Sequence, residues 1–512
     1  MSDQAFQITA ILIYFSAMLG IGYYAFRQTK TADGYLLAER GLRPSVAALS
    51  ANASDMSGWL LLGLPGAIYA TGLFEAWIAI GLVIGSYLNW LFVAPRLRAY
   101  TEIADDAITI PSFFDKRLKQ NSRPLRISAA VIILVFFTFY VSSGMVAAGK
   151  FFESTFGWQY LTGMLVVSAI TLLYTMFGGF LGATLTDVAQ GLLMLAALIA
   201  VPIVVVIQMG DLGTVVSTMQ AANPNALNLF ANPDNLSGLA WGMLVFSTAA
   251  WGLGYFGQPH IIVRFMALRT VAEAKVGRRV SVSWMLLSVG GAVAAALVGI
   301  AYFAGNPARP LEDPEAVFLL LSQIFFHPLV AGFVLAAVLA AIMSTMSSQL
   351  VVCTSALVED LYKLVNKDAP PKQQLMLGRL GVLVIAVIGC IMALDPQGTI
   401  LGLVEFAWAG FGAAFGPIVL LALFWRKLTA AGATAGMLVG AVTVFIWGNI
   451  PALKAEMYEI VPGFLLNLIV AIVVSRMSKP AAGVEAAFNQ MEEALRGGSS
   501  APVATQQEAT TH

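Results

Sequence analysis

An aspartate with small polar neighbours interrupts one of the long apolar stretches in this 512-residue chain. The segment 51–66 reads Ala-Asn-Ala-Ser-Asp-Met-Ser-Gly-Trp-Leu-Leu-Leu-Gly-Leu-Pro-Gly, and its acid is Asp55. A carboxylate at membrane depth costs about 2.5 to 3.5 kcal/mol on insertion scales, so its presence there indicates a function. The glycines and the proline favour an opened helix, whose freed carbonyls suit a small hard cation. We expect a membrane helix that is broken to hold an ion beside a substrate.

A second polar set lies in a later apolar stretch. Ala341, Ser344 and Thr345 have i, i+3 and i+4 spacing, so one carbonyl and two hydroxyls can face one point of a distorted helix. The carbonyls of Ala53 and Met56 bring the set to five uncharged oxygens. Such a site suits a monovalent hard ion, because calcium and magnesium want more ligands or several carboxylates. The alternative is that both hydroxyls bond back to carbonyls of their own helix.

A third segment, 251–260, is interrupted by glycines and ends in Gln-Pro-His. Trp251, Tyr255 and Pro259 recur at i, i+4 and i+8 and are expected to share a face, where two rings suit a compact apolar ligand. Simple packing of a helical core is the alternative. The glycines match the GxGxxG pattern, but no strand precedes them, so a nucleotide-binding loop is not expected. Close helix packing through small residues would explain them equally well.

The elements that position these residues are membrane helices. The chain is 59% hydrophobic and 11% charged, far from the roughly 25% charged residues of soluble domains. No basic, aromatic-laced patch indicates a nucleic-acid partner. Cys353 and Cys390 both lie in apolar segments, so neither a disulfide framework nor a zinc site is expected. At about 20 apolar residues per span, we predict an all-α polytopic protein of thirteen helices, near 5–26, 44–71, 74–98, 126–150, 160–182, 187–208, 238–263, 279–304, 316–347, 376–395, 399–425, 430–449 and 458–477.

Charge distribution predicts the orientation of these helices. Of the 28 Lys and Arg residues, all except Lys150, Arg309 and Lys454 fall on the cytoplasmic side if the N-terminus lies outside. We therefore expect the N-terminus outside, the C-terminus in the cytoplasm and a first helix that is retained rather than cleaved. The outer loops 210–238 and 305–315 are acidic or polar and either form short lids or are simply solvated.

The two interruptions predict an internal repeat. Gly/Pro-broken helices at matching places in two halves mark inverted-repeat transporters and point to the binding site. The breaks in the second and seventh helices predict two five-helix units, helices 2–6 and 7–11, with helices 1, 12 and 13 outside them. The expected parts are 1–43 (first helix and loop), 44–208 (first repeat), 209–237 (extracellular loop), 238–425 (second repeat), 426–479 (last two helices) and 480–512, a tail that is largely disordered apart from one amphipathic piece.

Several strings in the chain resemble the sodium/solute symporter family, and most closely its proline-transporting bacterial branch. They are Leu49-Ser-Ala-Asn-Ala-Ser-Asp-Met-Ser-Gly-Trp-Leu60, Phe136-Phe-Thr-Phe-Tyr140, Gly178-Gly-Phe180, the segment from Trp251 to His260 with Arg264-Phe-Met266, and Ala340-Ala-Ile-Met-Ser-Thr345 followed by Glu359-Asp-Leu-Tyr362. The resemblance runs from the first helix to the thirteenth. It implies a leucine-transporter-like fold and sodium-coupled uptake of L-proline by alternating access across the bacterial plasma membrane, with one sodium per proline.

The resemblance also implies roles for individual residues. Sodium would bind Ala53, Met56, Ala341, Ser344 and Thr345; Asp55 and Asp187 would serve sodium coupling; and proline would contact Ser57, Gly58, Tyr140, Trp251, Tyr255 and Pro259. A helix N-terminal acid stabilised by the dipole is an equally good explanation of Asp187. No cofactor beyond the transported ion and no obligate protein partner is expected. Another solute on the same scaffold, such as pantothenate or a sugar, is the first alternative, and a membrane sensor or enzyme is the second.

Overall fold

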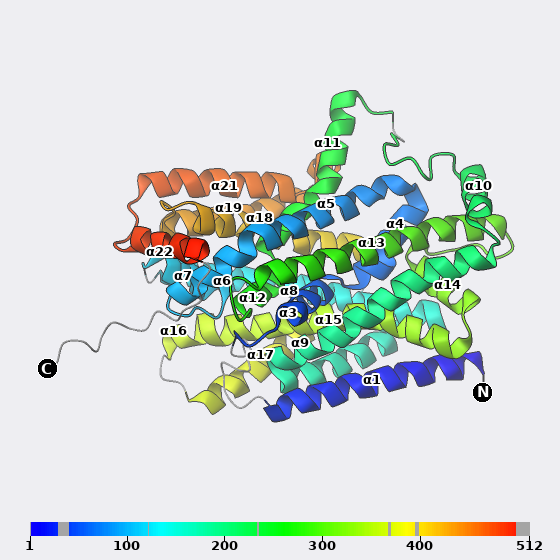
Figure 1. Ribbon diagram of the computed structural model, residues 1–512, viewed down its shortest axis with the longest axis horizontal. Coiled ribbons are helices and arrows are strands. Elements are labelled where there is room, and N and C mark those ends of the chain that lie inside the picture. The colour runs from blue at the N-terminus through cyan, green and yellow to red at the C-terminus, as the bar shows by residue number, and fades with distance from the viewer. Residues whose placement is uncertain are drawn as a thin grey trace.

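The structure is a computed structural model that describes residues 2–28, 40–120, 122–232, 235–366, 370–394 and 399–497. Over these residues the chain is helical and holds one isolated β-bridge, between Leu42 and Leu268. The long helices run roughly parallel along the bundle (Figure 1). They are α1 (Asp3–Gln28), α5 (Ala76–Leu88), α6 (Ala94–Ile103), α8 (Arg123–Phe156), α9 (Tyr160–Gln208), α13 (Ala274–Gly305), α15 (Pro328–Ser355), α17 (Pro371–Met392), α18 (Ile400–Phe424), α19 (Ala430–Asn449) and α21 (Ile460–Met477).

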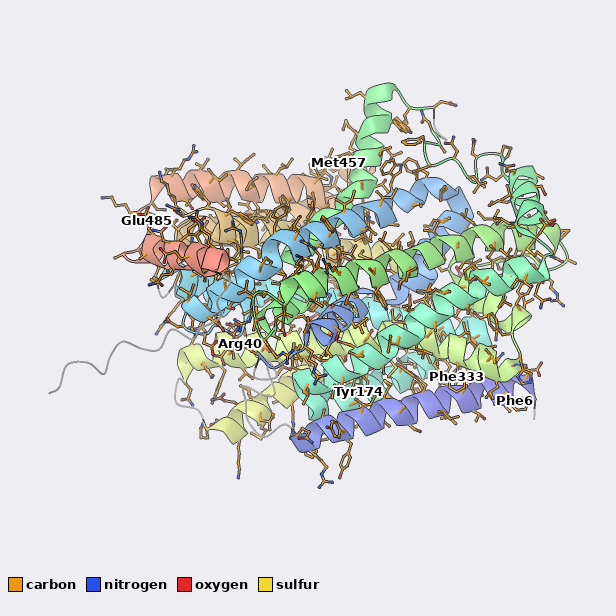
Figure 2. The ribbon with its side chains drawn as sticks, in the orientation of Figure 1. Phe6, Arg40, Tyr174, Phe333, Met457 and Glu485 are labelled. Atoms are coloured by element: carbon orange, nitrogen blue, oxygen red, sulfur yellow. The ribbon has the colours of Figure 1, made fainter. Side chains whose placement is uncertain are left out.

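The two ends of the described chain lie at opposite ends of the bundle. Phe6 of α1 is at one end, and Glu485 of α22 (Val484–Gly497) is at the other (Figure 2). The space between the helices is filled by side chains, and α1 packs along α9 and α15.

Eleven helical stretches of the described chain are long and apolar enough to cross a membrane, with Leu73–Ile103, which contains α5 and α6, counted as one and Gly238–Gly257 included. The predicted count of thirteen differs for two reasons. The pair predicted at 160–182 and 187–208 forms one element, α9, which carries a non-helical residue, Gly179, with φ 58°. The helix predicted at 44–71 is divided into pieces that are each too short to span.

The first predicted break falls where the glycines and polar residues indicated it. Helix α3 (Pro44–Asp55) ends at the aspartate, and Met56 leaves the helix with ψ 81°. A π-helical turn, Trp59–Gly63, and then α4 (Leu64–Thr71) resume the path. The indole nitrogen of Trp59 donates to the Asp55 carbonyl at 3.1 Å, so a side chain satisfies one carbonyl that the break releases.

The second break lies in the Gly-rich segment. Helix α11 (Gly238–Ala249) tightens into a 3₁₀ segment, Ala250–Gly257, and α12 (Pro259–Met266) follows. The 3₁₀ segment packs closely against α5. A Cβ on Gly85 of α5 would lie 2.2 Å from the carbonyl oxygen of Gly252 in the 3₁₀ segment. Only glycine fits so close an approach.

The helix predicted at 316–347 is wrong in its bounds. Two helices replace it, α14 (Val317–Phe325) and α15, and the second continues through a π-helical segment, Ala356–Tyr362, into α16 (Lys363–Val365). His327 accepts from the Leu329 amide through its ring at 3.3 Å and starts α15 just before Pro328. The apolar run continues across this start, so hydropathy gave no sign of it.

The connecting segments carry short helices of their own. Helix α10 (Leu212–Ala222) lies in the predicted outer loop 210–238 and packs on α13 with Val215 and Met219 buried. Residues 233–234 of the same loop lie outside the described residues. Helices α7 (Ile110–Leu118) and α20 (Pro451–Glu456) complete the set. The amphipathic piece predicted in the tail corresponds to α22, whose Phe488 and Met491 are buried against α6. Residues 498–512 lie outside the described chain.

Candidate functional site

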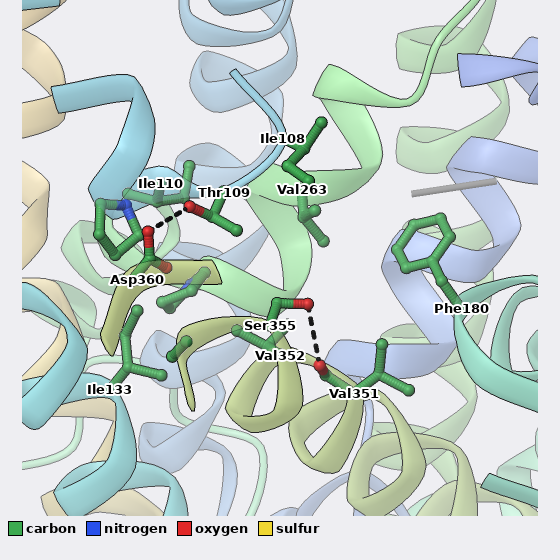
Figure 3. A pocket seen from close by; sticks show the side chains of 13 residues that line it. Ile108, Thr109, Ile110, Ile133, Phe180, Val263, Val351, Val352, Ser355 and Asp360 are labelled. Atoms are coloured by element: carbon green, nitrogen blue, oxygen red, sulfur yellow. Dashed lines mark hydrogen bonds between the residues drawn. The ribbon is translucent and has the colours of Figure 1, made fainter. Parts of the chain in front are cut away.

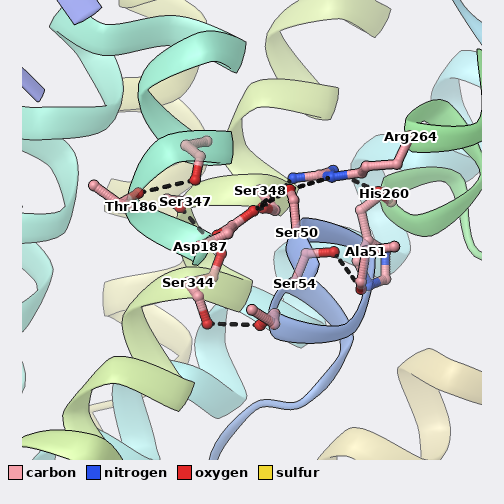
Figure 4. Close-up of polar contacts among 12 residues, drawn as sticks. Ser50, Ala51, Ser54, Thr186, Asp187, His260, Arg264, Ser344, Ser347 and Ser348 are labelled. Carbon is pink, nitrogen blue, oxygen red and sulfur yellow. Dashed lines mark hydrogen bonds and ion pairs between the residues drawn. The ribbon is translucent and has the colours of Figure 1, made fainter. Parts of the chain in front are cut away.

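The predicted ion ligands of α3 and α15 meet in the buried centre of the bundle. The Ser344 hydroxyl lies 2.7 Å from the Ala53 carbonyl and 3.1 Å from the Ala341 carbonyl (Figure 4). One hydroxyl thus links the end of a broken helix to an unbroken neighbour. The back-bonding alternative explains only part of this geometry, because the shorter contact crosses to α3.

Thr345 and Met56 complete the predicted ion ligands. The Thr345 hydroxyl is buried and has no hydrogen-bond partner in the described part of the chain. Met56 is also buried, and its amide donates to the Asn52 carbonyl at 2.9 Å where α3 ends. A buried hydroxyl without a partner loses its hydrogen bond to water, so this position has unused capacity for a ligand.

Asp55 connects the two broken helices. Its side chain is 1% exposed, and the Tyr255 hydroxyl donates to one carboxylate oxygen. The other oxygen, Oδ1, has no partner among the described residues. Since Asp55 ends α3 and Tyr255 lies in the 3₁₀ segment, the carboxylate ties together the two places where the helices open.

Asp187 lies in a buried ionic network. Its Oδ2 atom is 3.1 Å from the Arg264 guanidinium and 2.6 Å from the Ser50 hydroxyl (Figure 4). Arg264 also donates to the Ser348 hydroxyl at 2.6 Å, one helical turn beyond Ser344. Both charged side chains are at most 1% exposed. The explanation of Asp187 as a helix N-terminal acid is wrong, because this residue lies inside α9 well past the kink at Gly179.

Sequence reasoning missed Arg264, Ser50 and Ser348 as parts of this network. A signal was present, since a charged residue at membrane depth requires a partner. Arg264 and Asp187 are distant in sequence, and the side chains that bring them together come from four helices, α3, α9, α12 and α15. Hydropathy therefore indicated that each charge needs a partner without identifying it.

The predicted substrate rings lie in an aromatic group around Trp408. Tyr255 and Trp408 form an edge-on pair with centroids 5.2 Å apart, and Trp251 stacks on Trp408 at 6.4 Å. The Trp408 indole nitrogen donates to the Trp251 carbonyl at 2.8 Å. Tyr458 approaches Trp251 at 5.4 Å. Trp408 and Tyr458 were not predicted, because they come from α18 and from the connection between α20 and α21, far along the chain.

Tyr140, Ser57 and Gly58 lie near the same centre. Tyr140 of α8 is buried, its hydroxyl is next to Ser57, and its ring lies 6.0 Å from that of His260. A Cβ on Gly58 would lie 3.0 Å from the Ala147 side chain, so the missing side chain lets the broken helix pack against α8. This packing is a structural reason for a glycine at position 58, whatever contact it makes with a substrate.

Pro259 and the two rings lie in different elements, because the rings belong to the 3₁₀ segment and Pro259 starts α12. The segment before it is a 3₁₀ helix with three residues per turn, so positions four apart differ by about 120° rather than the small angle of an α-helix. Pro259 instead lines a crevice between α7, α8, α12 and α15. The continuous α-helical spacing from which a shared face of Trp251, Tyr255 and Pro259 was predicted is therefore absent.

These features define a membrane transporter whose two broken helices meet at a buried polar centre. The chain belongs to the sodium:solute symporter family, whose sequence model matches residues 35–440. The osmoregulated proline transporter OpuE of Bacillus subtilis is 51% identical over 96% of this chain and 98% of its own length. The high-affinity proline transporter PutP of the same organism is 49% identical over 93% of this chain and its full length. The relatives are transporters by name, and this chain is accordingly a transporter and not an enzyme.

Solved structures of other transporters share the fold. A sodium-coupled sialic acid symporter in a substrate-bound, outward-open state superposes with a TM-score of 0.78 at 19% identity, covering 93% of this chain and 98% of that one. MhsT in complex with L-phenylalanine superposes with a TM-score of 0.51 at 17% identity, covering 84% of this chain and 97% of that one. At these identities the likeness establishes the architecture, and the ligands remain those of the other proteins.

Proposed function

We propose that this protein takes up L-proline coupled to sodium by alternating access, with one sodium ion per proline. The observation that supports sodium is the Ser344 hydroxyl between the carbonyls of Ala53 and Ala341, next to the Thr345 hydroxyl, which has no hydrogen-bond partner among the described residues. Proline as the solute is supported by relatives near 50% identity that are named proline transporters.

The proposed sodium site uses the carbonyls of Ala53, Met56 and Ala341 and the hydroxyls of Ser344 and Thr345. When sodium enters, the Ser344 hydroxyl rotates its hydrogen away and offers a lone pair, so both carbonyls become ligands. Asp55 remains outside this set and favours the cation through its negative charge. Asp187 of α9 binds Arg264, which in turn binds Ser348 of α15. Through this network Asp187 acts on the route by which sodium leaves its site.

The proposed proline site lies between the two breaks. The pyrrolidine ring packs against Trp251 and Tyr255, with Tyr140, Ser57 and Gly58 on the opposite side. The carboxylate is favoured beside exposed amide groups at the start of the helix that resumes after Ser57. Pro259 contacts the solute from the crevice side as the inner half opens.

The proposed topology has thirteen spans, with the N-terminus outside and the C-terminus in the cytoplasm of a bacterium. Residues 44–71 count as one broken span, and α9 counts as two spans joined at Gly179. The inverted repeats are then 44–208 and 238–425. The preference of Lys and Arg for cytoplasmic segments supports this orientation.

One sodium per proline supplies enough free energy for strong accumulation. Moving one charge inward down 100 mV yields about 2.3 kcal/mol, and a tenfold sodium gradient adds about 1.4 kcal/mol. The sum of about 3.7 kcal/mol corresponds to several-hundred-fold accumulation of proline.

The proposal is tested by uptake of labelled proline into proteoliposomes that hold the purified protein. Sodium outside is compared with potassium outside at the same membrane potential. Concentrative uptake only with sodium is the expected result. No uptake in vesicles whose protein is folded and inserted would remove proline as the solute, and equal uptake with both ions would remove sodium.

A further inference from the structure

A crevice opens between the two halves of the bundle at the end opposite the start of α1. Its walls are mainly apolar and come from α7, α8, α9, α12 and α15, with Ile133, Val263 and Val352 among them (Figure 3). Thr109, Ser355 and Asp360 are its three polar side chains. An apolar wall with a few convergent polar groups is the usual composition of a small-molecule site.

Asp360 is the unusual residue of this crevice. It lies in the π-helical segment Ala356–Tyr362 and is fully buried. Its Oδ1 atom accepts from the Thr109 hydroxyl at 2.8 Å (Figure 3). The same atom lies 3.5 Å from the Arg126 guanidinium. Its Oδ2 atom has no hydrogen-bond partner within the described residues, and neither has Nε of Arg126. The buried acid and the partly exposed base next to it therefore each keep one position without a hydrogen-bond partner among the described residues.

The crevice is connected to the proposed transport route. Phe180 lies on its wall, and the Arg264 guanidinium of the central ionic network lies 5.1 Å from that ring. Pro259, at the start of α12, lines the crevice too. Along α15, Ser344, Ser348 and Ser355 are spaced by four and seven residues and follow one side of the helix from the proposed sodium site to the crevice.

The two unused positions and the apolar walls fit one class of ligand. A zwitterionic amino acid with a compact apolar side chain offers an ammonium to Oδ2 of Asp360, a carboxylate to Arg126 and a hydrocarbon ring to the walls. A bare sodium ion fits less well, because it wants several oxygens and the arginine repels it. The crevice is narrow, so it has to widen before such a solute can enter.

We propose that this crevice is an exit site for the transported solute, where Asp360 pairs with the ammonium and Arg126 with the carboxylate. The inference rests on the proposed function and adds a second solute site on the cytoplasmic half. It predicts that replacing Asp360 changes the half-saturating proline concentration at the cytoplasmic face and not at the outer face.

The test compares Asp360→Asn with the wild type in right-side-out and inverted membrane vesicles from cells without another proline transporter. Asparagine keeps an acceptor for Thr109 and removes the charge. We expect the half-saturating proline concentration at the cytoplasmic face to rise at least tenfold and that at the outer face to change less than twofold. Glu359→Gln is the matched control, because this neighbouring carboxylate pairs with Lys363 at 2.6 Å instead, and both constants should stay unchanged.

Ser355→Cys, with Cys353 and Cys390 replaced by serine, measures occupancy directly. Proline on the cytoplasmic side should slow alkylation of this cysteine by a membrane-impermeant maleimide, and adding Asp360→Asn should abolish the protection. Two results would overturn the exit site alone. One is an equal rise in the half-saturating proline concentration at both faces, and the other is unchanged protection of the cysteine against alkylation in the Asp360 variant. No proline flux at either face of the wild type would overturn the proposed function and the exit site with it.

Discussion

Replacing Thr345 by valine separates ion binding from folding. The Thr345 hydroxyl is buried without a partner in the described chain, whereas that of Ser344 contacts two carbonyls. Valine has nearly the same shape, and removing an unpaired buried hydroxyl costs little stability. If the hydroxyl is a sodium ligand, its loss removes a contact to a charged group worth about 1.5 to 3 kcal/mol.

The expected result is a roughly 10- to 150-fold rise in the sodium concentration for half-maximal proline uptake. The assay is a sodium titration of uptake at fixed membrane potential, paired with thermal unfolding of the purified protein in detergent. Ser344→Ala is the comparison, because it should weaken sodium activation and also lower stability by about 1 to 3 kcal/mol through its lost partners. An unchanged sodium requirement in Thr345→Val would refute the assignment of this hydroxyl to the ion.

Three further changes test the charged groups. Asp55→Asn keeps an acceptor for Tyr255 but removes the charge; it should insert normally and raise the sodium requirement at least tenfold, and normal sodium activation would exclude an electrostatic role. Arg264→Gln leaves the Asp187 charge buried without its ionic partner, which should lower stability by about 3 to 5 kcal/mol. The double variant with Asp187→Asn should recover folded protein, as measured by size-exclusion chromatography. No recovery would contradict the pairing of Asp187 with Arg264. Burial raises the pKa of Glu459 from 4.5 to about 7, so the folded protein binds this proton more tightly than the unfolded chain. Stability should then fall by up to about 3 kcal/mol between pH 5 and 8, and thermal unfolding of Glu459→Gln should lose this dependence.

The sequence predicted the two breaks because their causes are local. Gly58, Pro65 and the polar residues around Asp55 change the backbone where they stand, and so do the glycines from Gly252 to Gly257. The start of α15 at Pro328 was missed, because the hydrophobic run on both sides carried more weight than one proline.

Long-range partners were harder to predict. Asp55 and Tyr255 were each identified as site residues, but their contact joins segments 200 residues apart. Arg264 and Trp408 acquire their roles only through packing of distant helices. Burial indicates that such groups need partners, and only the tertiary arrangement selects which partners they find.

The position of the first break explains how ion and solute affect each other. Ala53 faces Ser344 of α15, Asp55 accepts from Tyr255 of the 3₁₀ segment, and Ser57 lies next to Tyr140. These three residues of one short stretch therefore contact three different helices. An ion that draws Ala53 toward α15 also moves the carboxylate and the serine that face the proposed proline site. By linkage, the solute must favour sodium by the same free energy, typically about 1 to 3 kcal/mol.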